Sequence, residues 1–397
     1  MTPLVLTTFT AVSAIGRGVA AMADALASAR SGLRPCRFEN TAIKTWTGEV
    51  AGLDDMTVCE RLAEFDCRNN RLAELALEQD GFAAAVESAC AKYGSRRIAV
   101  ILGTSTSGIL ETEHAYRQRD AQTGALPAGY RFATTHNLYA STDFVRRYLN
   151  LDGPAVMLST ACSSSAKVFA SAWRMISLGL CDAAVVGGVD SLCRNTLYGF
   201  ASLGLVGSEP CRPCDAQRAG ISIGEAAGFA LLERPERATS HSGVALLGYG
   251  ESSDAYHMSS PHPEGEGAAL AMRRALSAAA LEPSAIDYVN MHGTASLVND
   301  SMEDKAISSV FGTETAASST KGWTGHALGA SGITEAVISA LSIQKGLLPG
   351  CLNTRELDPS LTSKILLRNQ HAPVRRVLSN SFGFGGSNCS LIFGAHP

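Results

Sequence analysis

The sequence predicts an α/β fold in which mixed sheets are covered by helices on both faces. Short apolar runs, of the kind that form buried strands, alternate with longer segments whose apolar residues recur at helical spacing. The same alternation runs through both halves of the chain, which has 397 residues. Hydrophobic residues make up 46% of the chain and charged residues only 18%, so we expect a large buried core.

The first half of the chain opens with an expected strand at 4–10, followed by helical spacing over 16–30. The segment 60–92 is rich in Ala, Leu and Glu and predicts one or two long helices. The other expected elements of this half are strands at 98–102, 156–158 and 183–188, helices at 137–149 and 163–178, and a small-residue turn at 103–108.

The second half follows the same order of elements. Its expected strands lie at 229–233, 244–250, 286–292, 374–381 and 390–393, and its expected helices at 267–280, 300–311 and 327–345. Ligands of such folds bind beyond the carboxyl ends of the strands. Cys162, His292 and the segment 382–388 all fall at expected strand ends, which predicts a shared site there.

Composition narrows the class of protein. The net charge of −4 does not indicate nucleic acid as the main partner. The 11 cysteines show no framework spacing, and 1–8 lacks the features of a secretory signal, so we expect reduced thiols and a cytoplasmic location. No apolar stretch predicts a membrane span. Cys211 and Cys214 form a lone C-x-x-C pair without further ligands nearby, so we expect no metal site.

Cys162 is the first candidate for a catalytic residue. It stands between the expected strand at 156–158 and the expected helix at 163–178. Backbone N–H groups and the positive end of a helix dipole meet at such a junction. They lower the pKa of a thiol from about 8.5 toward neutrality, and the thiolate is the nucleophile. This predicts covalent catalysis; the alternative is a buried structural cysteine.

Two histidines occur in glycine-flanked turns. His292 is followed by Gly293, and His326 follows Gly325, so the backbone can approach a ligand closely at both places. A single histidine is more often a surface or core residue, but two of them beside a candidate thiolate favour a site. The glycine-rich segment 380–388 offers N–H groups for an oxyanion hole, with a hairpin turn as the alternative.

These motifs resemble those of the β-ketoacyl-acyl carrier protein synthases, the elongating condensing enzymes of fatty acid and polyketide assembly. The resemblance covers nearly the whole chain and keeps the family's order. The matching segments are Thr-Ala-Cys-Ser-Ser at 160–164, Asp-Ala-Gln-Arg-Ala-Gly at 215–220 with Gly-Glu-Ala-Ala-Gly at 224–228, His-Gly-Thr at 292–294, Lys-x-x-x-Gly-His at 321–326 and Gly-Phe-Gly-Gly-Ser-Asn at 383–388.

The resemblance implies a thiolase-like fold, in which two similar α/β halves form a five-layered αβαβα arrangement, usually as a dimer. We place the half that carries the nucleophile at 1–240. The half that carries the two histidines is then 241–397.

The resemblance also implies a decarboxylative Claisen condensation, an acyltransferase reaction. Cys162 takes an acyl group from a carrier-protein thioester, and the backbone N–H groups of Cys162 and Phe384 hold the oxyanion. A malonyl thioester then loses carbon dioxide, while His292 and His326 donate hydrogen bonds to its carbonyl oxygen. The resulting enolate attacks the acyl group and yields a β-ketoacyl thioester that is two carbons longer.

Other residues are expected to support this chemistry. Lys321 and Glu335 should form a pair, because an unpaired buried charge is costly. Asp300 and Glu303 match acidic positions of the same network, although a solvated helix face is the alternative for Glu303. Thr106 stands where the family usually has an apolar side chain against the acyl chain. Its polarity favours a specialised polyene or polyketide pathway over housekeeping fatty acid synthesis.

The set of one Cys and two His distinguishes this chain from initiating synthases, which carry Asn in place of one His, and from thiolases, which use a second Cys. A Cys-His hydrolase and a structural subunit of an active synthase remain as alternatives. The expected partner is an acyl carrier protein that bears the substrates on phosphopantetheine, with no cofactor bound by the enzyme itself. The dimer partner is a second copy or a chain-length-factor-like subunit. Arg61, Arg68 and Arg71 are candidates for carrier docking, with a solvated face as the alternative.

Overall fold

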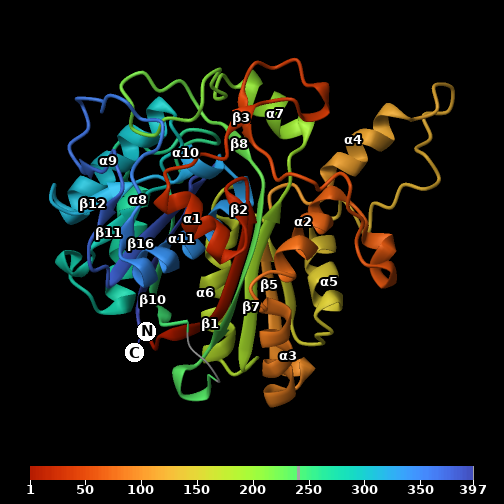
Figure 1. Cartoon of the computed structure of the whole chain (residues 1–397), viewed down its shortest axis with the longest axis horizontal. Coiled ribbons are helices and arrows are strands. Elements are labelled where there is room, and N and C mark those ends of the chain that lie inside the picture. Colours follow the sequence, from red (N-terminus) through yellow and green to blue (C-terminus); the bar gives the residue numbers. More distant parts are fainter. Residues whose placement is uncertain (239–241, 397) are drawn as a thin grey trace.

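The computed structural model describes residues 1–238 and 242–396. Five strands of its first half lie side by side (Figure 1). In spatial order they are β6 (Ala155–Leu158), β5 (Ile98–Gly103), β7 (Ala183–Asp190), β9 (Ala226–Glu233) and β1 (Leu4–Ser13). The strands β6, β5 and β7 are parallel, whereas β9 runs antiparallel to both β7 and β1.

The second half repeats this arrangement. Its strands, in spatial order, are β14 (Lys364–Ile365), β12 (Ala316–Ser318), β11 (Tyr288–Asn290), β16 (Arg376–Gly383), β17 (Ser387–Ala395) and β10 (Val244–Ser253). The first four are parallel, and β17 is antiparallel to β16 and β10. A short antiparallel pairing of β1 with β10, with Leu4 opposite Leu246, joins the two half-sheets.

Helices form three layers around the half-sheets, which confirms the predicted five-layered αβαβα fold (Figure 1). One outer layer contains α2 (Arg68–Leu77), α3 (Phe82–Tyr93) and α5 (Leu138–Tyr148). The middle layer contains α1 (Val19–Ala27), α6 (Ser164–Ser177) and α11 (Ser331–Lys345). The other outer layer contains α8 (Glu266–Ala279) and α9 (Leu297–Phe311).

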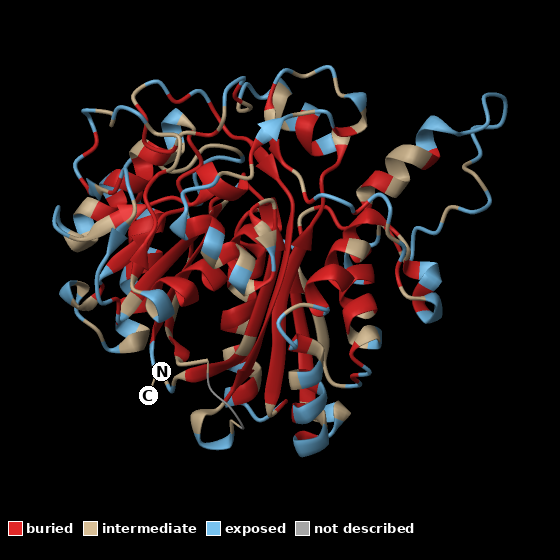
Figure 2. Cartoon of the chain, viewed as in Figure 1, coloured by how far each residue is buried: buried red, intermediate tan, exposed pale blue. Residues whose placement is uncertain are grey.

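Smaller elements surround this core. They are β2 (Gly16–Arg17), β3 (Arg34–Pro35), β4 (Trp46–Gly48), β8 (Ile223–Gly224), β13 (Leu347–Leu348), β15 (Gln370–His371), α4 (Ile109–Arg117), α7 (Arg194–Ser202) and α10 (Lys321–Thr324). The segment from α4 to the start of α5 projects away from the sheets, and much of it is exposed (Figures 1 and 2).

Most predicted elements are confirmed, and the differences are local. The strand expected at 229–233 as part of the second half is β9, which lies between β7 and β1 in the first half-sheet. The segment 60–92 forms a 3-10 turn and two helices, which are separated by a left-handed Gly81 (φ 68°). The helix expected from 300 begins at Leu297, because the hydroxyl of Ser296 caps it by accepting from Asn299 N. The short helices α4 and α7 were not predicted.

The boundary predicted between the halves, at 240/241, lies outside the described residues and stays a prediction. Among the described helices, none combines the length and the apolar character that a membrane crossing requires.

The two central helices approach each other through glycine. Both α6 and α11 are largely buried between the half-sheets (Figure 2). A Cβ added at Gly332 of α11 would lie 2.5 Å from the backbone nitrogen of Ala166 in α6. A Cβ added at Gly103, at the end of β5, would lie 2.4 Å from Ser165 N. The start of α6 is therefore held between β5 and α11 with no room for a side chain at either contact.

We expect Gly332→Ala to destabilise the protein by about 1–3 kcal/mol, because overpacking at a backbone contact outweighs the better helix propensity of alanine. The matched control is Gly199→Ala in α7, where an added Cβ meets nothing within 4 Å. The control should be neutral or stabilise by up to about 1 kcal/mol. Urea denaturation measures both changes, and equal stability of the two variants would contradict the packing argument.

Candidate active site

Cys162 lies in the tight connection between β6 and α6. The residue before it, Ala161, has a left-handed backbone (φ 52°), and Ser163 leads directly into the helix. Hydrogen bonds within the connection fix its shape, including Ser164 Oγ to the carbonyl oxygen of Ala161 and Thr160 N to Ser164 Oγ (2.9 Å). Cys162 is 5% exposed and lines a cavity between the two halves.

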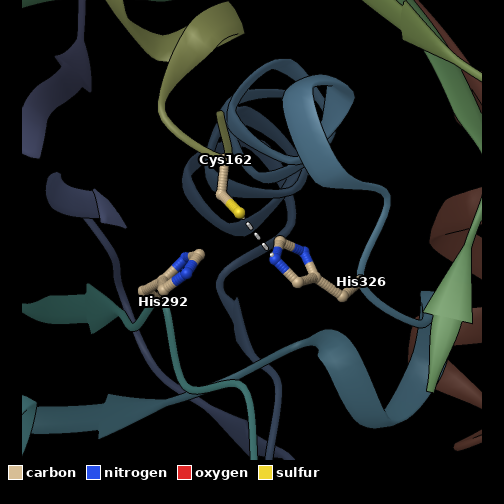
Figure 3. A group of neighbouring side chains, drawn as sticks. All are labelled: Cys162, His292 and His326. Atoms are coloured by element: carbon tan, nitrogen blue, oxygen red, sulfur yellow. Dashed lines mark hydrogen bonds between the residues drawn. The ribbon is translucent and has the colours of Figure 1, made fainter. Parts of the chain in front are cut away.

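His326 reaches this thiol from the other half of the chain. Its Nε2 lies 3.0 Å from Cys162 Sγ, and its Nδ1 lies 2.9 Å from the hydroxyl of Ser331 (Figure 3). The preceding Gly325 has a left-handed φ of 74° and packs against Gly224, so a side chain has no room there. His326 N donates to the carbonyl of Ser222 (2.7 Å), which anchors the turn.

His292 completes a group of three side chains (Figure 3). Its ring lies 5.3 Å from that of His326, at an interplanar angle of 83°. The Lys321 ammonium lies 3.3 Å from His292 Nδ1 and also donates to the carbonyl oxygen of His292. An ammonium can only donate, so Nδ1 accepts and the ring proton of the neutral His292 is on Nε2. His292 is therefore held as a hydrogen-bond donor toward the cavity.

Lys321 and Glu335 form a buried ion pair, at 1% and 3% side-chain exposure. Burial is the main reason that the pKa of Glu335 is raised to about 7, and the neighbouring Lys321 opposes this shift. Burial also lowers the pKa of both His292 and His326 well below 6.5, with Lys321 adding to the effect. Both imidazoles are thus neutral at physiological pH.

Glu303 and Asp300 hold the backbone around His292. Glu303 accepts from the amides of His292 (2.8 Å) and Gly293 (2.7 Å) and from Asn380 Nδ2 (3.1 Å). Asp300 accepts from the amides of Ala295 and Cys214 and lies beside Arg218. Both carboxyls are fully buried, so the solvated helix face that was the alternative for Glu303 is excluded. Burial raises the pKa of Glu303 to about 7.

The thiol of Cys162 differs from the sequence-based expectation. A pKa near neutrality was predicted from the helix start, but burial raises the pKa of Cys162 to about 12. Lys321 and the backbone amide of Phe384 act in the opposite direction, and Asp190 and Glu335 add to the increase. Desolvation thus outweighs the helix terminus at this position. The thiol needs a base, and His326 Nε2 is within hydrogen-bond distance of it.

The glycine-rich segment forms the turn of the β16–β17 hairpin and also lines the cavity. The backbone amide of Phe384 hydrogen-bonds to the sulfur of Cys162. Its role in an oxyanion hole stays a prediction. The Phe384 ring is 36% exposed at the cavity and lies 5.4 Å from that of Phe200. Val298 and Leu205 add further apolar surface to the lining.

Thr106 is placed elsewhere. It is buried, and its amide and hydroxyl both donate to Asp190 at 3.0 Å. Among the described residues that line the cavity beside Cys162, Thr106 does not occur. Its role in an acyl pocket stays a prediction.

The structure alters the candidates for carrier docking. Arg68 is 3% exposed, and its guanidinium is paired with the buried Glu225, so its prediction as a docking residue is wrong. Arg71 pairs with Asp66, and Arg61 donates to backbone carbonyls of α5 and its end. An alternation of charged and apolar residues on a helix does not reveal which charges are turned inward.

Two residues of the site had no part in the sequence-based prediction. Asp190 ends β7 and contacts the turns that carry Thr106 and His326. A carboxylate directly after a buried strand could have been noted as a signal. Ser331, the partner of His326 Nδ1, could not have been predicted from the sequence. Its contact with His326 depends on where α11 begins.

The ligand atoms of Cys162, His292 and His326 all lie within 4.8 Å of one another, as metal ligands do. The chemistry of this set does not fit a metal, however. With Lys321 beside Nδ1, the ring of His292 presents an N–H rather than a lone pair to the cavity.

Comparison with known proteins assigns the family. Residues 1–238 match the family described as "Beta-ketoacyl synthase, N-terminal domain", and residues 244–355 match "Beta-ketoacyl synthase, C-terminal domain". The chain belongs to the β-ketoacyl synthase family. The chain is also 32% identical to 3-oxoacyl-[acyl-carrier-protein] synthase 2 of Vibrio cholerae, over 98% of both proteins.

Two further β-ketoacyl synthase relatives illustrate the range of this family. The mitochondrial 3-oxoacyl-[acyl-carrier-protein] synthase of Arabidopsis thaliana is 40% identical, over 61% of this chain and 56% of that protein. A solved structure of the ketosynthase ApeO in complex with its chain length factor ApeC, from Xenorhabdus doucetiae, superimposes with a TM-score of 0.89. It is 39% identical and covers 100% of this chain and 98% of that chain.

Glu303 gives this β-ketoacyl synthase a pH-dependent stability. Its pKa rises from 4.5 to about 7 on folding, so the folded state holds a proton that the unfolded state releases. The resulting stabilisation is complete below pH 4.5 and is lost as the pH rises through about 7. In the wild type, the free energy of unfolding should therefore be higher at pH 4.5 than above pH 7. Glu303→Gln should make this difference smaller by on the order of 3 kcal/mol.

Urea denaturation at the two pH values measures this difference. The control is Glu264→Gln, an exposed carboxyl whose pKa is lowered by Lys305. This control should leave the decline with rising pH in place. The pKa of Glu335 is also raised to about 7, so part of the decline should remain in Glu303→Gln. A decline as large as that of the wild type would show that Glu303 is not one of its sources.

Proposed function

We propose that this chain catalyses the decarboxylative Claisen condensation of an acyl group on Cys162 with malonyl-acyl carrier protein. The observation that carries the proposal is the pair of unlike histidines facing one thiol: His326 at 3.0 Å from the sulfur, and His292 held as a donor by Lys321. A thiol and one base suffice for acyl transfer to the enzyme. The second imidazole, His292, is needed only as a hydrogen-bond donor to a carbonyl group that develops negative charge in the cavity.

In the first half-reaction, Cys162 attacks the thioester carbonyl of an acyl carrier protein. His326 Nε2 accepts the thiol proton and passes it to the departing phosphopantetheine sulfur, so the proton balance closes. The amides of Cys162 and Phe384 hold the oxyanion of the tetrahedral intermediate. Removal of one such donor typically lowers the rate ~10²–10³-fold.

In the second half-reaction, a malonyl thioester enters and loses carbon dioxide. His292 and His326 donate from Nε2 to its carbonyl oxygen, which carries the charge of the enolate. The enolate carbon attacks the acyl carbonyl, the bond to sulfur breaks, and the Cys162 thiolate takes a proton from water. Between the two half-reactions the single imidazole proton of His326 moves from Nδ1 to Nε2 by exchange with water. Ser331 accommodates both tautomers, because a hydroxyl can accept from Nδ1–H in one step and donate to Nδ1 in the next.

This proposal extends to the setting of the reaction. The substrates travel on the phosphopantetheine of the carrier protein, and the enzyme binds no cofactor of its own. A cytoplasmic location is supported by the cysteines, all 11 of which are free. The pathway is the assembly of a fatty acid, a polyene or a polyketide.

Substitution of the three side chains separates this function from its alternatives. We expect Cys162→Ala to abolish acylation. His292→Ala should retain acylation but lower β-ketoacyl formation ~10²–10³-fold, because the enolate loses a donor. His326→Ala should slow both half-reactions. His371→Ala is the control, since this exposed residue lies in β15 outside the site.

Intact-protein mass spectrometry follows acylation, and chromatography follows the product formed with malonyl-carrier present. Release of free acid in place of a β-ketoacyl product, unaffected by His292→Ala, would identify a hydrolase. Absence of label on Cys162 with any acyl donor would identify a structural subunit.

We further propose that the subunit pairs with a second copy or a chain-length-factor-like subunit along β6. Within the described chain, β6 pairs only with β5, so one edge is open. The carbonyls of Pro154 and Leu158 face β5, which turns the N–H of Met157 toward the open edge. The ketosynthase ApeO, solved in complex with its chain length factor, supports the heteromeric form.

Met157→Pro should therefore shift the assembly to monomers while the fold is kept, because proline is tolerated on an edge strand whose N–H faces outward. Light scattering after size exclusion measures the mass, and circular dichroism checks the fold. Met157→Val is the control and should remain assembled. A proline variant with wild-type mass would exclude β6 as the interface.

A further inference from the structure

Asp190 is a fully buried carboxylate, at the end of β7, that has no step in the proposed reaction. Its oxygens accept hydrogen bonds from the turn after β5. The donors are Thr104 Oγ1 at 2.6 Å, Ser105 N at 2.9 Å, and Thr106 N and Oγ1, both at 3.0 Å. Burial raises the pKa of Asp190, and these donors act in the opposite direction by stabilising its charged form.

The same carboxylate also contacts the turn that follows His326 in the chain. Gly329 N donates to Asp190 Oδ2 at 2.6 Å, and Gly329 belongs to the 3-10 turn Leu328–Ala330 directly before α11. A Cβ added at Gly329 would lie 2.6 Å from that oxygen, so a side chain there would force the contact apart. One carboxylate thus joins the turn after β5 to the turn after His326.

The charge of Asp190 also acts on the thiol of Cys162. Its negative charge, like that of Glu335, raises the pKa of the Cys162 thiol, after burial as the largest cause. Lys321 is the charged group that acts in the opposite direction. The imidazoles of His292 and His326 next to the thiol are neutral.

We propose that Asp190 is a positioning residue, which holds the His326 turn against the turn after β5 and so keeps His326 within reach of Cys162. Thr106, the predicted acyl-pocket position, is fixed by the same carboxylate. The shape of that turn and the placement of His326 are therefore linked through one side chain. The effect that we expect on acylation of Cys162 rests on the proposed function.

The test is Asp190→Asn, which keeps the size of the side chain but removes its charge and one acceptor. We expect acylation of Cys162 to slow ~10–100-fold, because His326 is less well placed. The pH midpoint of Cys162 alkylation by iodoacetamide, followed on the Cys162 peptide by mass spectrometry, should move to lower pH, because an anion facing the thiolate is gone. A merely loosened structure would also admit water to the thiol and lower its midpoint, so Gly329→Ala is measured beside it. This variant forces the contact apart but keeps the charge of Asp190, so its acylation should slow without a shift of the alkylation midpoint to lower pH.

The matched control is Asp304→Asn. Asp304 is also buried and accepts from the amides of Thr362 and Ser363, but it lies outside the site. It should change neither the acylation rate nor the alkylation midpoint. Should Asp190→Asn fail to fold, Gly329→Ala takes its place, and its acylation should slow in the same range.

Wild-type acylation and an unchanged midpoint in Asp190→Asn would overturn the inference, as would equal effects in Asp304→Asn. If Asp190→Asn does not fold, wild-type acylation in Gly329→Ala overturns it. Alkylation needs neither an acyl donor nor a carrier protein. Failure of the wild type to condense would therefore refute the proposed function, while the alkylation midpoint would still decide the role of Asp190.

Discussion

The close contact of α6 with α11 is the constraint on which the site depends. Cys162 belongs to the first half of the chain and His326 to the second, and each lies in the connection that leads into one of these helices. Backbone contact at Gly332 lets the helices approach without side chains between them. The sulfur and the imidazole can then meet at 3.0 Å, although 164 residues separate them in the sequence.

The two histidines differ in the protonation patterns open to them, because their buried neighbours differ. A fixed cation, Lys321, next to His292 leaves that ring a single protonation pattern. A neutral hydroxyl, Ser331, next to His326 leaves that ring two patterns. Glu303 acts on the backbone of His292, which it holds by accepting hydrogen bonds from the amides of His292 and Gly293. Two chemically identical side chains thus acquire separate properties from their neighbours alone.

The alternation of apolar strands and helices predicted the fold because buried strands and amphipathic helices carry strong periodic signals. The motifs predicted the three central side chains. Cys162 and His292 follow strands, as expected, whereas His326 lies in a glycine-flanked turn after the short helix α10. The pKa of Cys162 was predicted wrongly, since desolvation depends on the whole surrounding shell and not on the adjacent helix. The burial of the Arg68 side chain was not predicted for a similar reason, because its partner Glu225 is 157 residues away in the chain.

The high pKa of Cys162, about 12, has a consequence for the enzyme between turnovers. Peroxides and other electrophiles in the cell attack thiolates, and a thiol with this pKa exposes almost none at neutral pH. The resting protein is therefore chemically quiet although Cys162 lines the cavity. In the mechanism we propose, reactivity arises only when a bound thioester brings its carbonyl to the sulfur while His326 removes the proton, so the same burial that makes the nucleophile weak also protects it from damage.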